Sequence, residues 1–469
     1  MADKHADLVL KNVLKKIKPS KADAGAMAAL YKKVIVAASK NKTVRPLICG
    51  SVEKGTWLAD RKELDMFLLF DPKTSREDLE KKGLDMAKKI IASLKGKYVI
   101  AYAEHPYLKG ELKFKGKAYG IDIVPAYAVS DPSKIKSAVD RTPYHVKFVK
   151  EHLTEKLADE TRLLKAFMKA SGCYGADTKS RGFSGYLCEL LAIKYNSFLD
   201  ALRAAADSWN AGYVINLNGK VDIATAQHTF RAPLIVIDPV DPNRNVAAAV
   251  SPEIFFRFIQ ASAHFLRTPS AKHFFPLAPK PYSLAEISKE VASRRTRLYL
   301  IKFARPADVI DDILWPQLRR ASQLVGKVLE EGGFRVLRSG EWADEKICVL
   351  MFELDVWQVP KAVKHIGPSI YSHKQSEAFL EHYANRRAFI ENDCWTVETE
   401  RSHTVALLYL KEFFAQPEKE LLARGIPNKL LGMGKAAIDS GGGSIKLMRS
   451  LPEGFRTFVR EYFEKDLRA

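Results

Sequence analysis

The chain has 469 residues, 47% of them hydrophobic, and a formal net charge of +20, which fits roughly three globular domains and a polyanionic partner, most commonly nucleic acid. Its five cysteines include no C-x-x-C pair, so we expect no disulfide framework or zinc ribbon and predict a cytoplasmic protein. No apolar run approaches the roughly 18 residues of a membrane span, and residues 1–16 lack a signal-peptide core, so we expect no membrane partner.

The first 127 residues predict a mixed α+β domain built on a sheet. Residues 1–40 place apolar side chains at helical spacing. Between Arg45 and Tyr127 the pattern changes to short β-type runs: PLICG, LDMFLLF, KYVIAYA, ELKFKG and YGIDIVPAY. One helix interrupts them, from about Ser75 to Leu94, because Ser75 is a typical N-cap residue with acidic residues behind it.

The next segment, about residues 140–266, is mainly helical in pattern. In RLLKAFMKASG, apolar residues form one stripe and three basic residues, Arg162, Lys165 and Lys169, gather on another face at spacings of three and four. This basic face is either a triphosphate clamp or an ordinary solvated face. Gly172 is expected to end the helix. The following RGFSGY is expected to be a tight packing turn before a helix, with phosphate binding at the helix N-terminus as the alternative.

From about Arg297 the order of elements is expected to be β-α-β-β, as in half of a ferredoxin-like domain, a layout common among RNA-binding domains. Pro316 is expected to open the helix. Residues 417–450 are less regular, and Gly441 to Ser444 are expected to form a flexible loop. The C-terminal RTFVREYFEKDLRA either contacts RNA or forms an amphipathic helix that packs through Phe458, Tyr462 and Phe463.

Three acidic residues lie in segments that otherwise predict buried strands. Side chains alternate along a strand, so Glu63 and Asp65 share one face of ELDMFLLF. Asp122 lies among apolar residues in YGIDIVPAY. Taken singly, Glu63 and Asp65 could mark an exposed strand end, and Asp122 could bond to backbone. Together they favour a metal site, because neighbouring carboxylates near a core repel one another unless a cation such as Mg²⁺ is bound.

Two shorter motifs lie near these acids in the sequence, one before Glu63 and one between Asp65 and Asp122. GSVEKGTW follows an apolar strand, and a Gly-Ser turn allows backbone N–H groups and the hydroxyl of Ser51 to approach a phosphate, with the charge of Lys54 nearby. AEHPY offers Glu104 and His105 as metal ligands, but a turn between two strands is the preferred interpretation because Pro106 interrupts the strand and no second histidine lies nearby.

With these motifs in place, the chain resembles the archaeal-type (class I) CCA-adding enzymes, tRNA nucleotidyltransferases of the DNA polymerase β superfamily. The resemblance is strongest from Gly50 to Ala248 and thinner after about Ser270. The matching stretches are GSVEKGTW, ELDMFLLF, AEHPY, GIDIVPAY, KSAVDRTPYH, RLLKAFMKASGCYGA, RGFSGYLCELL and DPVDPNRNVAAAV.

The resemblance implies a two-metal transfer of nucleotides to an RNA 3′ end. Glu63, Asp65 and Asp122 would hold two Mg²⁺ ions, one activating the 3′-hydroxyl and one holding pyrophosphate. CTP would be used twice and then ATP, without a nucleic-acid template, at the acceptor arm of tRNA. The remaining implied contacts are to the incoming nucleotide: Ser51 and Lys54 to the triphosphate; His145, Lys165 and Tyr174 to phosphates and sugar; and Arg244 to the base edge and RNA phosphates.

Two residues depart from the family pattern in the phosphate-gripping turn. Glu53 is an acid where a small or neutral residue is more usual, so it must point away from the triphosphate or pair with Lys54. Lys54 stands where relatives also use arginine, so a bidentate phosphate contact is lost.

The fold class expected from these patterns is α+β, with a polymerase β-like nucleotidyltransferase sheet domain, a helical central domain, a ferredoxin-like body and an α/β tail. The expected boundaries are residues 1–135, 136–270, 271–380 and 381–469, with the tail inserted in the body or following it and the last segment forming the tail and the return to the body. Family members are commonly dimeric, so a homodimer is a further expectation. Two rival functions stay open: a poly(A) polymerase or oligoadenylate synthase with the same three acids, and an RNA-binding protein that has lost the chemistry.

Overall fold

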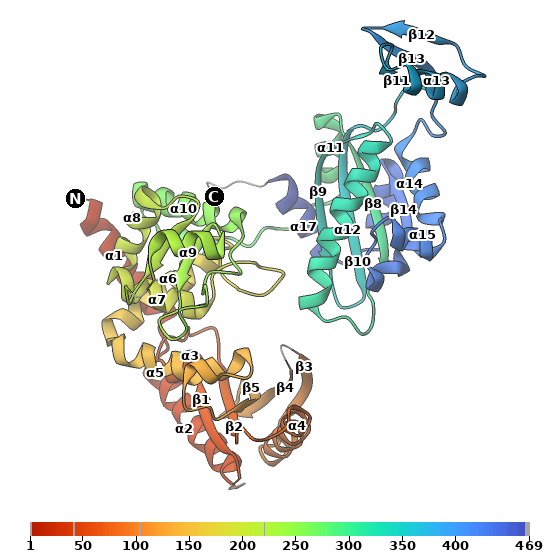
Figure 1. The fold of residues 1–469 in the computed structure, drawn as a ribbon. Helices are drawn as coiled ribbons and strands as arrows, with labels where there is room; N and C mark the ends of the chain where they lie inside the picture. Colours follow the sequence, from red (N-terminus) through yellow and green to blue (C-terminus); the bar gives the residue numbers. More distant parts are fainter. Residues whose placement is uncertain (1, 41–42, 103–104, 220, 465–469) are drawn as a thin grey trace. The chain divides into compact units, whose positions relative to one another are not determined.

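The computed structural model describes residues 2–40, 43–102, 105–219 and 221–464. The chain forms two compact units that divide after Leu277 (Figure 1). Both units combine helices with sheets, so the expected α+β class is confirmed. Within the described ranges, no helix is both long and apolar enough to cross a membrane.

The first unit contains a five-stranded sheet with the order β1-β2-β5-β4-β3. Strands β2 and β5 pair in parallel, and the other neighbours pair antiparallel. The strands are β1 (Arg45–Cys49), β2 (Glu63–Phe70), β3 (Lys97–Tyr102), β4 (Pro106–Phe114) and β5 (Lys117–Tyr127). All five expected β-type runs are therefore strands.

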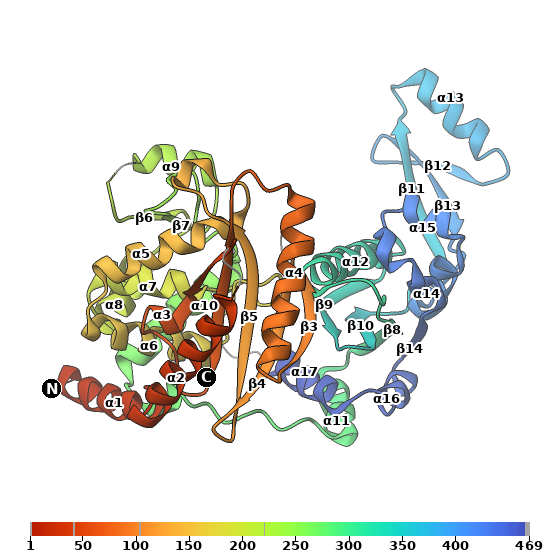
Figure 2. The same ribbon diagram turned by 90° about the horizontal axis from the view of Figure 1, so that it is seen from below.

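Two helices cover one face of this sheet, α2 (Lys21–Ala38) and α4 (Arg76–Ser93), and Figure 2 shows α4 running along the sheet. The even-numbered residues of β2, Leu64 to Phe70, point into the core beneath these helices. The odd-numbered Phe67 and Leu69 pack on the opposite face, as the alternation of β2 predicts. The hydroxyl oxygen of Ser75 accepts a hydrogen bond from the N–H of Asp78 and caps α4, which confirms the predicted start of this helix.

The rest of the first unit is mainly helical. Its core contains a cluster of buried phenylalanines centred on Phe167. Helix α1 packs into this core through Leu10 and Val13, although its neighbour in the sequence, α2, packs on the sheet. The elements are α1 (Ala2–Ile17), α5 (Thr142–His152), α6 (Glu155–Ala170), α7 (Gly185–Tyr195), α8 (Phe198–Ser208), α9 (Ile223–Phe230), α10 (Pro252–Arg267), and the parallel pair β6 (Tyr213–Asn216) and β7 (Leu234–Ile237).

Two predicted turns in this helical part are confirmed. Gly172, with a φ of +68°, follows the end of α6. The RGFSG turn is a packing turn, because a Cβ at Gly182 would lie 2.2 Å from the carbonyl oxygen of Cys173. Ser184 then caps α7 by accepting a hydrogen bond from the N–H of Leu187.

The second unit is built on an antiparallel sheet with the order β14-β8-β10-β9. The strands are β8 (Arg297–Ala304), β9 (Arg335–Ala343), β10 (Ile347–Val356) and β14 (Ala437–Ser440). One face packs on α12 (Asp311–Glu331), α14 (Ala406–Ala415) and α15 (Glu418–Ala423). The other packs on α11 (Leu284–Arg294), α16 (Gly442–Met448) and α17 (Glu453–Phe463). The predicted β-α-β-β order is thus present as β8-α12-β9-β10.

A second sheet of this unit has three strands in the order β11-β13-β12, with α13 (His373–His382) packed against β11. Its strands are β11 (Ala362–Ser369), β12 (Ala388–Glu391) and β13 (Cys394–Glu400).

Two predictions in the second unit are wrong. Helix α12 begins at Asp311, not at Pro316. The acidic side chains of Asp311 and Asp312 suit the positive end of a helix. Pro316 lies in the second turn of the helix, where it has no backbone N–H to donate. Gly441 to Ser444 do not form a flexible loop. Gly441, with a φ of +56°, makes the turn into α16. The buried hydroxyl of Ser444 donates a 2.7 Å hydrogen bond to the carbonyl oxygen of Gly441.

The described part of the C-terminal segment is helical. In α17, Phe455, Val459 and Tyr462 are buried, and Phe458 and Phe463 pack against the same core. The amphipathic-helix interpretation is therefore confirmed as far as Glu464, and the last residues of that motif lie outside the described part of the chain.

Candidate active site

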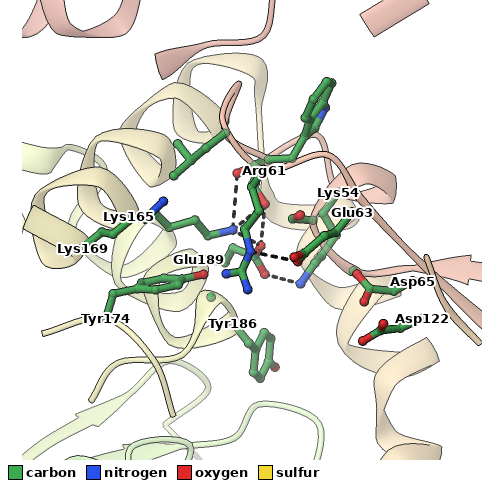
Figure 3. Close-up of a pocket in the computed structure, with 16 residues that line it drawn as sticks. Lys54, Arg61, Glu63, Asp65, Asp122, Lys165, Lys169, Tyr174, Tyr186 and Glu189 are labelled. Atoms are coloured by element: carbon green, nitrogen blue, oxygen red, sulfur yellow. Dashed lines mark hydrogen bonds and ion pairs between the residues drawn. The ribbon is translucent and has the colours of Figure 1, made fainter. Parts of the chain in front are cut away.

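The three predicted acids lie on one side of the sheet of the first unit and line one cavity. Asp65 on β2 pairs directly with Asp122 on the parallel strand β5, and Glu63 precedes Asp65 on the same face. Figure 3 shows the carboxyl groups of Asp65 and Asp122 side by side. The Glu63 side chain is turned toward Arg61, whose Nε lies 2.8 Å from Glu63 Oε2.

For Asp65 and Asp122, the nearby positive charge does not offset the effect of burial on the carboxyl groups. Burial, together with the neighbouring charges of Asp122 and Glu63, raises the pKa of Asp65 to about 6. Burial also raises the pKa of Asp122, an effect that Lys109 partly offsets. A cluster of oxygen donors with unfavourable negative charge fits a hard divalent cation. Among the described residues, no three His, Cys, Asp or Glu side chains are gathered as a ligand set. Glu63 would therefore have to leave Arg61 to join Asp65 and Asp122.

The turn after β1 passes very close to Asp65. Strand β1 ends at Cys49, and the short helix α3 (Gly50–Glu53) follows. Gly50 has a φ of +69°, and a Cβ at this position would lie 1.7 Å from Asp65 Oδ2. Only glycine allows this approach without displacing the carboxylate. The turn also brings Ser51 and Lys54 to the cavity, as predicted.

Lys54 and Lys165 meet at a buried carboxylate that the sequence interpretation missed. Lys54 Nζ and Lys165 Nζ both donate to Glu189 of α7, the latter over 3.0 Å (Figure 3). Thr56 Oγ1 donates to Glu189 Oε1 over 2.6 Å and accepts from Lys165 Nζ over 2.8 Å. Burial alone raises the pKa of Glu189, but Lys165 and Lys54 outweigh burial and lower it to about 2. We call these four residues the lysine–glutamate cluster.

The predicted basic face of α6 divides into three different environments, so it is not an ordinary solvated face. Lys165 is buried in the lysine–glutamate cluster. Arg162 is also buried and holds the loop before β2, because its Nε donates to the carbonyl oxygen of Trp57 over 3.1 Å. Lys169 lines the cavity and pairs with Asp60 over 2.6 Å. Arg162 therefore has a structural role, while Lys165 and Lys169 face the cavity.

The cavity has a volume of about 320 Å³ and lies between the sheet and the helices of the first unit. Tyr174, a predicted nucleotide contact, lines it from the segment after α6, where it forms a β-bridge with Phe183. Tyr186 of α7 lines it as well. Seven of the nine predicted site residues therefore face one cavity: Ser51, Lys54, Glu63, Asp65, Asp122, Lys165 and Tyr174.

The other two predicted residues, His145 and Arg244, meet at Asp238, just after β7. His145 Nε2 lies 2.9 Å from Asp238 Oδ2, and Arg244 Nη1 donates to the same oxygen over 2.8 Å. Neither residue lines the cavity. They are linked to it through Tyr186, whose ring stacks on His145 at 4.1 Å and whose hydroxyl donates to Asp238 Oδ1.

Replacing Asp238 by asparagine is expected to lower stability at neutral pH by about 2 kcal/mol. Burial raises the pKa of Asp238, but the hydrogen bond from His145 and the other donors outweigh burial and lower it from 3.8 to about 2. A lowered carboxyl pKa stabilises the folded state above pH 3.8, and this contribution is lost as the pH falls toward 2. Urea midpoints at pH 7 and pH 3 should therefore differ more for the wild type than for D238N; equal pH dependence would contradict this.

Two further predictions on this unit can be compared with the structure. Glu53 points away from the cavity and pairs with Lys150 of α5 at 2.5 Å, which is the first of the two expected alternatives. His105, which lies between β3 and β4, is buried, and its Nε2 lies 2.6 Å from the carbonyl oxygen of Pro125 on β5, so it has a structural partner. Glu104 lies outside the described residues.

Comparison with known proteins identifies the family. Residues 159–275 match the model of the second domain of tRNA nucleotidyltransferase, and residues 294–421 match the C-terminal domain of the CCA-adding enzyme. The solved structure of the Cid1 poly(U) polymerase aligns with 58% of this chain and 96% of its own at 15% identity, with a TM-score of only 0.46.

Three relatives are CCA-adding enzymes that align over most of both chains. The enzyme of Methanocaldococcus jannaschii is 39% identical over 85% of this chain and 89% of its own. That of Methanothermobacter thermautotrophicus is 36% identical over 88% and 90%, and that of Methanosarcina acetivorans is 34% identical over 96% and 97%. The chain therefore belongs to the archaeal-type family of CCA-adding enzymes, which are tRNA nucleotidyltransferases.

Proposed function

We propose that this enzyme adds C, C and A in turn to the 3′ end of tRNA, using CTP and ATP and no nucleic-acid template. The RNA 3′-hydroxyl would attack the α-phosphate in line, and pyrophosphate would leave. The observation that carries the proposal is the meeting of Asp65 and Asp122 with two lysines at one cavity. Acids beside cations suit a magnesium-bound triphosphate.

Each group of residues has a separate proposed role. Glu63, Asp65 and Asp122 would hold two Mg²⁺ ions, because carboxylate oxygens are the ligands that this cation prefers. The raised carboxyl pKa values of Asp65 and Asp122 support a bound cation at this position. When bound, magnesium supplies activation of the 3′-hydroxyl and charge neutralisation for pyrophosphate. The residues proposed to hold the triphosphate are Ser51, Lys54, Lys165 and Tyr174, all of which line the cavity.

His145 and Arg244 would contact the sugar and base edge of the incoming nucleotide. Both are held by Asp238, and Tyr186 connects this group with the cavity. Fixed donors beside the triphosphate site could distinguish bases without a template strand, because hydrogen bonds to a base edge select one base over another.

The rest of the protein would bind the acceptor arm of tRNA by shape and phosphate contacts. We propose the four-part organisation with a polymerase β-like sheet domain over residues 1–135 and a helical domain over 136–270. A ferredoxin-like body over 271–380 would follow, with the tail inserted in it or following it, and residues 381–469 would form the C-terminal tail and the return to the body. The cytoplasmic location and the homodimer stay predictions.

The direct test incubates the purified protein with tRNA that lacks its terminal CCA and each labelled nucleotide in turn. Two CMP additions followed by a single AMP addition are expected. Long A tails would favour a poly(A) polymerase, and addition of UMP would also contradict the proposal. Binding of tRNA with no incorporation of any nucleotide would identify an RNA-binding protein without the chemistry.

A further inference from the structure

We propose that Glu189 is a positioning residue for the triphosphate, because it holds the ammonium groups of Lys54 and Lys165 together at the wall of the cavity. The inference rests on the proposed binding of a triphosphate in this cavity. Nothing in the sequence pattern assigned a role to Glu189, which lies on α7 among apolar residues and is fully buried.

The hydrogen bonds fix both ammonium groups at the cavity wall. An ammonium group has three donors. Lys165 Nζ donates to Glu189 Oε1 over 3.0 Å, to Thr56 Oγ1 over 2.8 Å and, over a longer distance of 3.4 Å, to the carbonyl oxygen of Thr56. Lys54 Nζ donates to Glu189 Oε2, and its ammonium group also lies 5.6 Å from the centre of the Tyr186 ring. Each lysine therefore has a fixed direction at the cavity that both side chains line. Lys54 keeps donors for a phosphate, and Lys165 would donate to one in place of its longest hydrogen bond, the one to the carbonyl oxygen of Thr56.

Two lysines brought together without Glu189 would not stay in this arrangement. Like charges in a buried site repel one another, and burial favours the neutral form of a lysine. Lysine side chains also have many rotamers, so an unfixed ammonium group loses more entropy when a ligand orders it. One carboxylate shared by two ammonium groups offsets the repulsion and leaves net positive charge for the triphosphate.

The second unit provides a matched control for a purely structural role. Glu353 of β10 is also fully buried, and it accepts hydrogen bonds from Arg294, Arg338 and the hydroxyl of Thr296. Glu189 and Glu353 thus share burial, two cationic partners and a threonine. They differ in the feature that matters here: the partners of Glu189 line the cavity of the first unit.

The test measures the dissociation constants of CTP and of inorganic triphosphate by calorimetry with magnesium, for the full chain. In E189Q, both constants are expected to rise by at least about tenfold, since a hydrogen bond between charged groups contributes this much or more. The factor should be the same for both ligands, because the two lysines are assigned to the phosphates. In E353Q, both constants should stay at the wild-type value.

A double-mutant cycle separates a positioning role of Glu189 from a general loss of structure in the variant. If Glu189 acts through Lys54, the effect of E189Q should be clearly smaller in a K54M background than in the wild type. Independent effects of the two substitutions, or unchanged constants in folded E189Q, would overturn the inference. If E189Q does not fold, the same cycle is measured with E189D, and the same two outcomes support or overturn the inference. These measurements use no tRNA, so they do not depend on the CCA-addition assay. If that assay failed while the cycle showed coupling between Glu189 and Lys54, the proposed function would be refuted and the positioning role of Glu189 would be kept.

Discussion

Replacing Asp65 with asparagine is expected to abolish nucleotide addition without lowering the stability of the protein. Asparagine has the same shape as aspartate, so it fits beside Gly50, where the space is tightest. It removes one of the two carboxylates that pair across β2 and β5. Loss of a metal-binding charge removes several kcal/mol of transition-state stabilisation, so the rate should fall by more than about a hundredfold.

The stability of D65N should be equal to or higher than that of the wild type. Burial raises the pKa of Asp65 from 3.8 to about 6. A carboxyl group whose pKa rises on folding makes the ionised folded state less favourable, so its penalty is absent below pH 3.8 and complete above about pH 6. Asparagine removes this penalty, which should increase the free energy of unfolding at pH 7 by roughly 1–2 kcal/mol.

The measurement combines single-turnover CMP addition with urea unfolding at pH 7. Asp85 of α4 is exposed and provides a matched control, since D85N removes the same charge from the opposite side of the first unit's sheet domain. D85N should keep wild-type activity. Retained activity in D65N would refute the role of Asp65, and a large loss of stability would refute the account of its environment.

Replacing Gly50 with alanine is expected to reduce activity by about a hundredfold, because a displacement of about 1 Å at a reacting group has an effect of this size. The new methyl group would lie 1.7 Å from Asp65 Oδ2, so either the turn or the carboxylate must move. The φ of +69° at Gly50 also disfavours alanine, and this backbone effect alone should lower stability by about 1–2 kcal/mol. The steric clash with Asp65 would add to this loss.

Gly55 is the control that separates these two effects. It has a φ of +68°, almost the same as that of Gly50, but no atom lies within 4 Å of a Cβ built at this position. G55A should therefore share the loss of stability from the backbone and keep most of the activity, as measured by CMP addition and thermal unfolding. Equal activity in G50A and G55A would show that contact with Asp65 is unimportant.

Much of the fold and the acidic part of the site could be predicted from local sequence patterns. The alternation along β2 indicated that Glu63 and Asp65 share a face, and the apolar run around Asp122 indicated a second buried strand. That this strand is the direct neighbour of β2 followed only from the fold. Ser75 and Gly172 marked helix ends because capping depends on only a few adjacent residues.

The partners of the basic residues could not be predicted in the same way. Glu189 and Asp238 meet Lys54 and His145 across more than 90 positions of sequence, and such pairing depends on how helices pack on the sheet. A signal was present, since both acids lie in apolar runs, YLCELL and LIVID, as Asp122 does. An acid in such a run requires a cationic or hydrogen-bonding partner, but its identity follows only from the fold.

The orientation of Glu63 leads to the most direct test of the proposed metal site. In the structure Glu63 pairs with Arg61, while Asp65 and Asp122 lie side by side. A crystal structure with Mn²⁺ and CTP, with the metal located by its anomalous scattering, should show Glu63 released from Arg61 and all three carboxylates bound to manganese beside the triphosphate. Manganese bound elsewhere, or coordinated without Asp65 and Asp122, would contradict the account.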